Sequence, residues 1–550
     1  MNFVIIIDIP IKMCYNLFTQ FEGKHFRKDN PMKKTLSLIL AICTILSICS
    51  FSVAAAPEGT AISSAAEFAA MAADGKYYLA NDITLDATYA ETFKGTLDGN
   101  GKTVTVSAPI FAAIEGATIK NLNVEGAIAY TVAEGETAPD SAAVAVNASG
   151  VIVLDNIVNK ASVTGAANAA GIVALINGGT ATVTNCANYG EINASAYVGG
   201  VISTFGTKDS SAEKDFITIS NCKNFGTITC GGQACGGILG YLSGGLKLTD
   251  SENHGTITNT SNMAGGIFGT PIKDLKNVCA VEIANCVNYG NVYATTVIAG
   301  IAARLGRAVA HTEFNYCITN CVNYGTIASY TGTPESGISF YISGIAGYAY
   351  GGTGNEISNC VNAGDIIADT THADAKSSIY IGGAIGYVNS KSYTIANNVN
   401  LGTVTFTTTP TAIGLVAYNK SAENTLNTNN YSVSTASDVT FTDAASTVIV
   451  TADQIASGEV ASLINEAAGA TVYYQAIGTD KVPTPFAAED GSNTIIKNAD
   501  GTYSNPVKEP ETTEPEVPET PKTGDSTVIF AVIAVISILG AAVVAKKREN

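Results

Sequence analysis

The motif NCVNYG occurs twice in this chain without change, at Asn285–Gly290 and Asn320–Gly325. Six looser copies begin at Asn156, Asn185, Asn221, Asp250, Asn359 and Asn397. From Gly190 to Gly402 the closing glycines are 36, 29, 35, 35, 39 and 38 residues apart, and a β-branched residue lies two positions after each. Repeats of roughly 20 to 50 residues build solenoids, propellers or arrays, so the chain is not expected to form a single globular core.

The residues between two copies of the motif predict the secondary structure of one unit. A typical unit reads as a strand at Ile318–Asn320, a turn at Cys321–Asn323, a strand over YGTIA and, after a loop, a strand at Ser343–Tyr348. Three short strands and three turns per unit are typical of one coil of a parallel β-helix. We therefore predict an all-β fold, a parallel β-helix with repeats over 109–429, and we expect right-handed coils from the general preference of parallel crossovers.

The fourth position of the motif holds asparagine in every unit. A stacked asparagine can hydrogen-bond to the asparagines above and below it, and it tolerates the left-handed backbone of a turn. We interpret this position as a structural ladder rather than a binding site. The ladder residues are Asn159, Asn188, Asn224, Asn253, Asn288, Asn323, Asn362 and Asn400.

The fifth position holds a row of rings. Two interpretations are open: the rings stack on sugars, or they pack turn on turn. The candidate ligand-binding residues are Tyr189, Phe225, Tyr289 and Tyr324, with His254 between them. The chain contains no tryptophan, which weakens the sugar interpretation.

Five cysteines share the second position of the motif, where other units carry isoleucine, serine or asparagine. A position that accepts these residues requires a small or apolar side chain that points inward. We therefore predict buried free thiols rather than disulfides. The pairs Cys230/Cys235 and Cys317/Cys321 lack a second pair at zinc spacing, and Asp98 with Asn100 is better read as a turn than as a calcium site. No metal or cofactor is predicted.

The N-terminal region predicts secretion. Lys33 and Lys34, an apolar stretch and small residues near Ala54 are typical of a signal peptide over 32–55, so we expect 1–31 to be a misassigned extension. Residues 56–108 are expected to form an N-terminal cap and the first coils, with a short helix over Ser63–Asp74 and a tight turn at Asp98–Gly101.

A small module is predicted after the repeats, over 430–506. Thr451 and Gln454 form a capping-box pattern ahead of a helix that ends near Gly469, and TVYYQAIGTDKVPTP reads as strand and turn. Solenoids require end caps, so we expect this module to be a C-terminal cap.

The C-terminus carries three segments in a fixed order. Residues 507–520 form a Pro/Glu/Thr-rich spacer, PKTGD begins 521–550, and the apolar stretch 527–545 is long enough for a transmembrane helix before KKREN. This order resembles the sorting signal of Gram-positive cell-wall proteins. The resemblance implies that a sortase recognises Pro521, Lys522, Thr523 and Gly524, cuts between Thr523 and Gly524, and attaches the chain to peptidoglycan. Thr520 stands where the usual pattern has leucine.

A second resemblance covers about residues 60–430. FKGTLDGNGKTV, ATIKNLNVEGAI, the recurring NCxNxG and the GGIxGY-like strands are similar to bacterial surface proteins with GLUG-type repeats on a pectin-lyase-like β-helix. The sequence departs from that repeat at IAGIAARLG and IGGAIGY.

Composition narrows the function classes. The net charge of −18 and the presence of four arginines in the whole chain argue against nucleic-acid binding. We expect a non-enzymatic adhesin or glycan-binding surface protein whose loops Thr207–Asp215, Ser329–Ser343 and Ala368–Ser378 contribute to binding. The alternatives are a polysaccharide lyase or glycoside hydrolase, and a passive stalk of the cell wall. Carbohydrate catalysis requires converging carboxylates, and none recur beside Arg304 and Arg307 in the sequence.

Overall fold

The computed structural model describes residues 57–133, 135–207, 214–271, 280–306, 315–330, 337–352, 354–371, 373–374, 376–390, 392–420, 425–433 and 446–506. The predicted signal peptide, spacer, sorting signal and transmembrane helix lie outside these ranges, so their structure is not tested. The chain divides into two units, Met1–Glu58 and Gly59–Asn550, and every element named below belongs to the second. Within the described ranges, the helices are too short and insufficiently apolar to span a bilayer.

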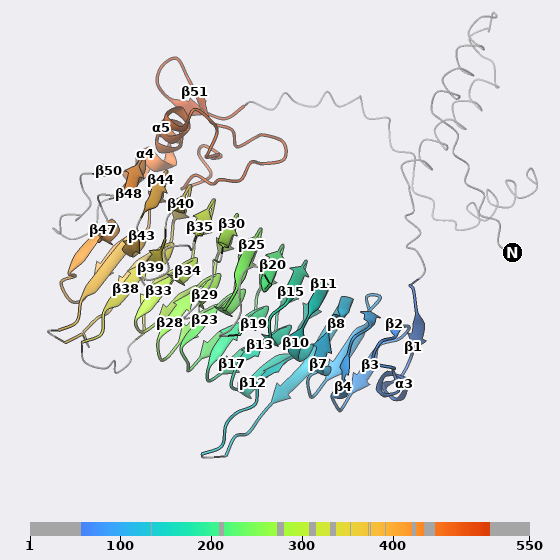
Figure 1. The fold of residues 1–550 in the computed structure, drawn as a ribbon. Coiled ribbons are helices and arrows are strands. Elements are labelled where there is room, and N and C mark those ends of the chain that lie inside the picture. Colours follow the sequence, from blue (N-terminus) through green and yellow to red (C-terminus); the bar gives the residue numbers. More distant parts are fainter. Residues whose placement is uncertain are drawn as a thin grey trace, which may run out of the picture. The chain divides into compact units, whose positions relative to one another are not determined.

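The second unit is an all-β parallel β-helix, in which strands of successive coils lie side by side (Figure 1). Each strand pairs in parallel with the equivalent strand of the next coil, as β30 (Ala280–Ala284) does with β35 (Asn315–Thr319) and β35 with β40 (Asn355–Ser358). Five strand positions recur along the coils, where three were predicted. Each bend is short, so the backbone pairs with the neighbouring coil both before and after it, and the bend divides one predicted strand into two. The handedness of the coils stays a prediction.

The first three positions form one extended sheet. The first row contains β1 (Thr60–Ile62), β2 (Lys76–Leu79), β5 (Thr96–Asp98), β15 (Thr180–Thr184), β20 (Phe216–Ser220), β25 (Gly245–Thr249), β30 (Ala280–Ala284), β35 (Asn315–Thr319), β40 (Asn355–Ser358), β44 (Tyr393–Ala396) and β48 (Thr425–Thr428). The second row contains β3 (Ile83–Leu85), β6 (Thr103–Val106), β16 (Ala187–Asn188), β21 (Lys223–Asn224), β26 (Glu252–Asn253), β31 (Val287–Asn288), β36 (Val322–Asn323), β41 (Val361–Asn362), β45 (Val399–Asn400), β49 (Asn430–Val433) and β50 (Thr447–Val450). The third row contains β12 (Ser162–Ala166), β17 (Ile192–Ala194), β22 (Ile228–Cys230), β27 (Ile257–Asn259), β32 (Val292–Ala294), β37 (Ile327–Ser329), β42 (Ile366–Ala368) and β46 (Val404–Phe406). Two longer strands, β8 (Thr118–Ala129) and β11 (Val151–Asn159), continue through more than one row.

The remaining two positions form the second sheet. The fourth row contains β9 (Ser141–Ala142), β13 (Ala169–Ala170), β18 (Tyr197–Gly199), β23 (Ala234–Gly236), β28 (Met263–Gly265), β33 (Val297–Ala299) and β38 (Phe340–Ser343). The fifth row contains β4 (Tyr89–Phe93), β7 (Phe111–Glu115), β10 (Ala145–Ser149), β14 (Val173–Ile176), β19 (Ile202–Phe205), β24 (Leu239–Leu242), β29 (Phe268–Pro271), β34 (Ala302–Leu305) and β39 (Ala346–Gly351). In the last coils β43 (Ile379–Ser390) and β47 (Ala412–Asn419) cover both rows without a break.

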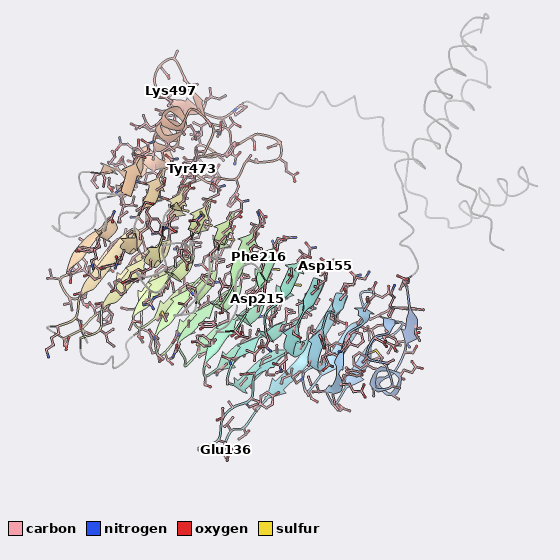
Figure 2. The ribbon with its side chains drawn as sticks, in the orientation of Figure 1. Glu136, Asp155, Asp215, Phe216, Tyr473 and Lys497 are labelled. Atoms are coloured by element: carbon pink, nitrogen blue, oxygen red, sulfur yellow. The ribbon has the colours of Figure 1, made fainter. Side chains whose placement is uncertain are left out.

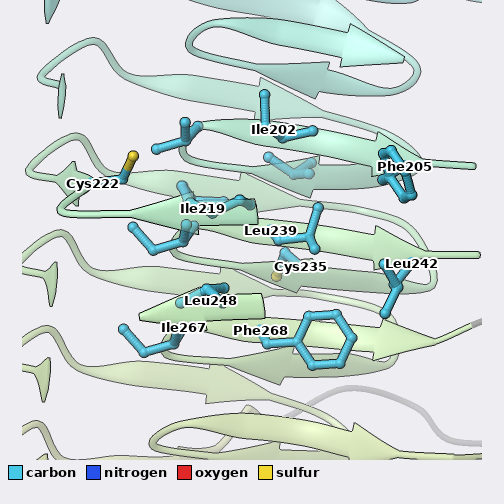
Figure 3. Close-up of a cluster of buried hydrophobic side chains, with 14 of the residues drawn as sticks. Ile202, Phe205, Ile219, Cys222, Cys235, Leu239, Leu242, Leu248, Ile267 and Phe268 are labelled. Carbon is cyan, nitrogen blue, oxygen red and sulfur yellow. The ribbon is translucent and has the colours of Figure 1, made fainter. Parts of the chain in front are cut away.

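The core lies between the two sheets and is built from columns of like residues. Ile202, Leu239 and Phe268 are register partners in three successive coils, and Phe205 lies above Leu242 in the same way (Figure 3). All five side chains are fully buried. Parallel in-register pairing places the same position of each coil over the one before, so the repeat in the sequence becomes a continuous apolar column.

The N-terminal elements differ in detail from the prediction. The helix α3 (Ala65–Ala69) is shorter than Ser63–Asp74; the Ser64 side chain accepts a hydrogen bond from the Glu67 N–H at its start. Phe68 packs against Tyr89 and Phe111. The turn at Asp98–Gly101 is a corner of a coil and not a hairpin, because β5 and β6 pair with strands of other coils rather than with each other.

The coils continue beyond the predicted boundary at residue 430, since β49 and β50 extend the second row. The C-terminal module, residues 451–506, then begins at the predicted capping box of Thr451 and Gln454. Its helix is interrupted: α4 (Ala452–Ala456) and α5 (Glu459–Ala468) are separated by Gly458, which has a left-handed backbone with φ of 86°. The predicted strand after it is reduced to one bridge, Tyr474 with Thr484, and β51 (Ile496–Lys497) pairs antiparallel with β52 (Tyr503–Ser504).

Candidate functional site: two aromatic surfaces

The fourth-position asparagines lie in one buried ladder. Asn288 Nδ2 donates to Asn323 Oδ1 at 2.7 Å, and Asn323 Nδ2 donates to Asn362 Oδ1 at 2.7 Å and to the Gly325 carbonyl at 2.9 Å. The same pattern links Asn159, Asn188, Asn224, Asn253, Asn288, Asn323, Asn362 and Asn400. From Asn188 to Asn400, each amide therefore has partners in the coils on both sides and within its own turn, which is a structural arrangement.

The left-handed backbone belongs to the first residue of the motif and not, as predicted, to the fourth. Asn285 and Asn320 have φ of 56° and 55°, and Asp250 takes the same conformation at 54°. Their side chains form a second ladder nearer to solvent, in which Asn320 Nδ2 donates to Asn285 Oδ1 at 3.2 Å. Asn121 and Asn429 show the same left-handed φ, so the motif extends beyond the eight units recognised in the sequence.

The glycines of the two repeat signatures leave room for these ladders. A Cβ on Gly300 would lie 2.2 Å from Asn323 Cγ, and a Cβ on Gly325 would lie 1.9 Å from the Gly290 carbonyl oxygen. The glycine in the second signature and the asparagine in the motif are therefore one packing unit, which explains why they recur together.

The cysteines of the described residues are free. Cys186, Cys222, Cys286, Cys321 and Cys360 are buried at the same position, and each Sγ donates to a carbonyl two residues earlier at 3.2–3.4 Å. Burial raises the pKa of the Cys186, Cys286 and Cys360 thiols. Cys317 differs from the prediction because it is only half-buried.

The candidate ligand-binding rings at the fifth position form a single column, the motif row. Tyr189 stacks on Phe225 at 4.5 Å between ring centroids with planes 8° apart, and Phe225 stacks on His254 at 4.6 Å. The column continues through Tyr289 to Tyr324. Each interior ring therefore has a parallel neighbour on both faces, and its edge is the part that reaches solvent.

A charged cluster lies beside the motif row. Glu252 accepts from Lys223 Nζ at 3.0 Å and lies 2.7 Å from His254 Nε2. Burial alone would raise the pKa of the Glu252 carboxyl, but the hydrogen bonds from His254 and Lys223 outweigh it and hold that pKa below its usual value. The cluster fixes the central ring of the row.

The C-terminal module packs on the side of the coils, along the motif. Its residues Ile455, Val460 and Tyr473 share an apolar cluster with the third-position valines of four consecutive coils, Val287, Val322, Val361 and Val399. The Tyr473 hydroxyl is 2.7 Å from the Asn397 carbonyl and 3.2 Å from the Cys360 carbonyl, where the module meets the coils (Figure 2). The prediction of an end cap did not anticipate this lateral contact.

A second aromatic surface was not found from the sequence. Six tyrosines gather on the sheet formed by β38, β39, β43 and β47, in a cluster separate from the main core. We call this group the tyrosine surface. Its members are Tyr341, Tyr348, Tyr350, Tyr380, Tyr387 and Tyr418.

The tyrosine surface contains two columns of rings in register with the coils. Tyr341 and Tyr380 are strand partners with centroids 5.3 Å apart and planes 5° apart. Tyr348, Tyr387 and Tyr418 form the other column, with centroids 5.0 and 5.1 Å apart. The columns meet at steep angles, 72° between Tyr341 and Tyr348 and 77° between Tyr380 and Tyr387. This is a herringbone, in which stacked rings within each column meet the rings of the other column edge to face.

The tyrosine surface has a buried floor and a more exposed rim. Tyr348 is buried, with the Arg304 guanidinium carbon 5.1 Å from its ring centroid. Tyr418 is 41% exposed, and Tyr341, Tyr380 and Tyr387 are half-buried. Burial, with the neighbouring Tyr341 and Tyr380, raises the pKa of Tyr387 to about 12, so its hydroxyl is neutral at physiological pH. The accessible rings therefore offer uncharged hydroxyls beside apolar ring surface.

A sequence signal for the tyrosine surface exists in the second repeat signature. Its strands read GIAGYAY, GGAIGYVN and GLVAYN in the last three coils. Earlier coils place Thr204, Tyr241, Thr270 and Arg304 at the register position of Tyr348, so tyrosine holds this position in consecutive coils only from Tyr348 onward. Aligning these strands rather than the NCxNxG motif would have found the column. The predicted binding loops do not share one edge: 329–343 and 368–378 connect the third row to the fourth, whereas 207–215 connects the fifth row to the first.

Among the residues that the structure describes, no group of three or more His, Cys, Asp or Glu side chains could hold a metal ion. Comparison with known proteins adds little. No family model matches the chain, and no curated protein matches it. A solved structure described as a putative immunoglobulin A1 protease from Bacteroides ovatus matches with a TM-score of 0.29 and 15% identity, covering 78% of this chain and 94% of that one. At this TM-score the likeness carries no argument.

Proposed function

We propose that this protein is a non-enzymatic surface protein that binds glycans, and that its tyrosine surface is the binding site. The observation that carries the proposal is the gathering of six tyrosines on one sheet face in consecutive coils. Glycan sites combine aromatic surface, on which the apolar faces of sugars pack, with a few polar groups that fix orientation. The solvent-facing edges of the two tyrosine columns supply the first and their hydroxyls the second.

The motif row is the weaker candidate for the same function. Its rings form a single column, and the module occupies the adjoining valines. These contacts support a role in holding coil to coil. The tyrosine surface is two columns wide, and one of its columns holds tyrosine in three consecutive coils, at Tyr348, Tyr387 and Tyr418.

The test is a binding measurement with matched variants. The full chain is applied to an array of bacterial and host glycans, together with the double variant Tyr387→Ala/Tyr418→Ala and the control Tyr189→Ala/Phe225→Ala. We expect the parent and the control to bind and the tyrosine-surface variant to lose binding. Loss in the control alone would move the site to the motif row. New reducing ends or unsaturated uronate absorbance would overturn the binder in favour of an enzyme.

We also propose that the protein is displayed on the cell wall of a Gram-positive bacterium. The support is the resemblance of residues 521–550 to a sorting signal, with sortase and peptidoglycan as the implied partners. Thr523→Ala is expected to move the protein from the wall fraction to the membrane and secreted fractions, because the implied acyl donor is lost. Release of the variant by wall digestion in the same amount as the parent would exclude sortase attachment.

A further inference from the structure

The two columns of the tyrosine surface have the spacing of the coils themselves. Register partners Tyr341 and Tyr380 are 5.3 Å apart, and the steps from Tyr348 to Tyr387 and from Tyr387 to Tyr418 are 5.0 and 5.1 Å. These values follow from parallel strand pairing, which sets neighbouring coils about 4.8 Å apart. The surface therefore repeats along one direction, and a ligand with the same repeat would meet the same group at each step.

We infer that the ligand of the tyrosine surface is an unbranched, uncharged β-1,4-linked polysaccharide lying along the columns; this rests on the proposed glycan-binding function. In such a polymer the chain is an extended ribbon, and each sugar advances by about the separation of neighbouring coils. Consecutive sugars can then each lie over one coil. An α-1,4-linked chain of the same sugar curves into a helix. It can therefore follow a straight row of rings only over a short length.

The charge of the protein favours a neutral polymer over an acidic one. The chain has a net charge of −18, which repels polyanions at long range. Among the described residues, Arg304 lies over the Tyr348 ring at the buried floor of this surface, and the exposed Lys420 lies two residues after Tyr418. The accessible groups of the surface are the rings and hydroxyls of Tyr341, Tyr380, Tyr387 and Tyr418, and burial keeps the pKa of Tyr387 at about 12. Uncharged sugar hydroxyls suit these partners.

The length of the surface predicts a length dependence. The columns cross the three coils that contain Tyr341 and Tyr348, then Tyr380 and Tyr387, then Tyr418. Affinity is expected to rise as an oligosaccharide grows to cover these coils and to change little with further sugars. Removing one accessible ring is expected to weaken binding by about tenfold, the size of one aromatic contact with its hydroxyl.

The experiment compares two polymers that differ only in linkage. Titration calorimetry of the full chain is carried out with β-1,4-linked and α-1,4-linked glucose oligomers of two to six sugars, and with β-1,4-linked N-acetylglucosamine oligomers. The expected result is binding of at least one β-1,4-linked series, levelling off with length, and about tenfold weakening by Tyr387→Ala. The control Tyr189→Ala is expected to bind as the parent does.

Two different failures are distinguishable. If α-linked or branched glycans bind as well as β-1,4-linked ones, and Tyr387→Ala still weakens them, the glycan-binding function holds and the linkage inference is overturned. If no glycan of the calorimetry or array panels binds, the proposed function itself fails. Circular dichroism and melting of each variant ensure that a loss of binding is not a loss of fold.

Discussion

The motif row and the tyrosine surface are both aromatic, both in register with the coils, and yet they are built differently. In the motif row five rings form one column, with planes 8° apart between Tyr189 and Phe225 and also between Tyr289 and Tyr324. In the tyrosine surface two columns meet at 72–77°. The motif row adjoins the buried asparagine ladder, whereas the tyrosine surface lies outside the main core.

The difference teaches that register alone does not decide what a repeated side chain does. Parallel coils stack any equivalent residues, so a ring repeated in every coil packs on its own copies. Such a column is held by the same contacts that hold the coils. The tyrosine columns stack in the same way, and what distinguishes them from the motif row is the second column that crosses the first. The predictions below separate stability from binding along this line.

The largest effect is expected at the motif glycines. In Gly325→Ala the new Cβ would lie 1.9 Å from the Gly290 carbonyl oxygen, so the backbone of two coils must separate. We expect a loss of at least about 3 kcal/mol in the free energy of unfolding, or failure to fold. Gly231→Ala is the matched control, because its nearest contact would be Ser195 Cα at an ordinary 3.8 Å. Equal denaturation midpoints for the two variants would show that the coils are not packed this tightly at the motif.

The next effect is expected within the asparagine ladder. Asn323→Ala removes the donor to Asn362 Oδ1 and to the Gly325 carbonyl, and the acceptor of Asn288. Leaving buried polar groups without partners should cost about 1 to 3 kcal/mol, measured by chemical denaturation. The exposed Asn193→Ala is the control. Tyr387→Ala also removes ring contacts, but it should leave no buried polar group without a partner, and it should weaken glycan binding by about tenfold. An unchanged midpoint for Asn323→Ala would remove the energetic distinction between the two surfaces.

The motif row and the tyrosine surface also differ in how well the sequence predicts them. The parallel β-helix and the position of the asparagine ladder follow from NCxNxG, because one period in sequence becomes one coil and equivalent residues must stack. The left-handed residue was placed three positions too late, since asparagine at both positions satisfies the same local preference. The tyrosine surface was missed because its rings come from strands read only as apolar, and the crossing of two columns depends on side-chain packing across strands.

The C-terminal module contacts one of the two regions only. Among the contacts described, it packs on the motif valines and does not touch the tyrosine surface. Tyr473→Phe deprives the Asn397 and Cys360 carbonyls of a hydroxyl donor but keeps the apolar contact. We expect a loss of about 0.5 to 1.5 kcal/mol by thermal or chemical denaturation, with glycan binding unchanged. Weaker binding in Tyr473→Phe, with the fold intact, would couple the two surfaces and contradict their independence.

The smallest effect is expected in the charged cluster of the motif row as the pH falls. The folded-state pKa of Glu252 lies below its ordinary value because of His254 and Lys223, so its ion pairs stabilise the fold above the pKa of the unfolded chain, about 4.3. That stabilisation is lost as the pH falls through the folded-state pKa. Between about pH 6 and pH 3, Glu252→Gln should therefore show a shallower fall in melting temperature than the parent, whereas the exposed Glu191→Gln should follow the parent. Tyr387, with a pKa of about 12, does not titrate in this range, so binding at the tyrosine surface should persist as long as the coils remain folded. Parallel curves for Glu252→Gln and the parent would mean that the cluster contributes nothing, and the motif row would then depend on ring stacking alone.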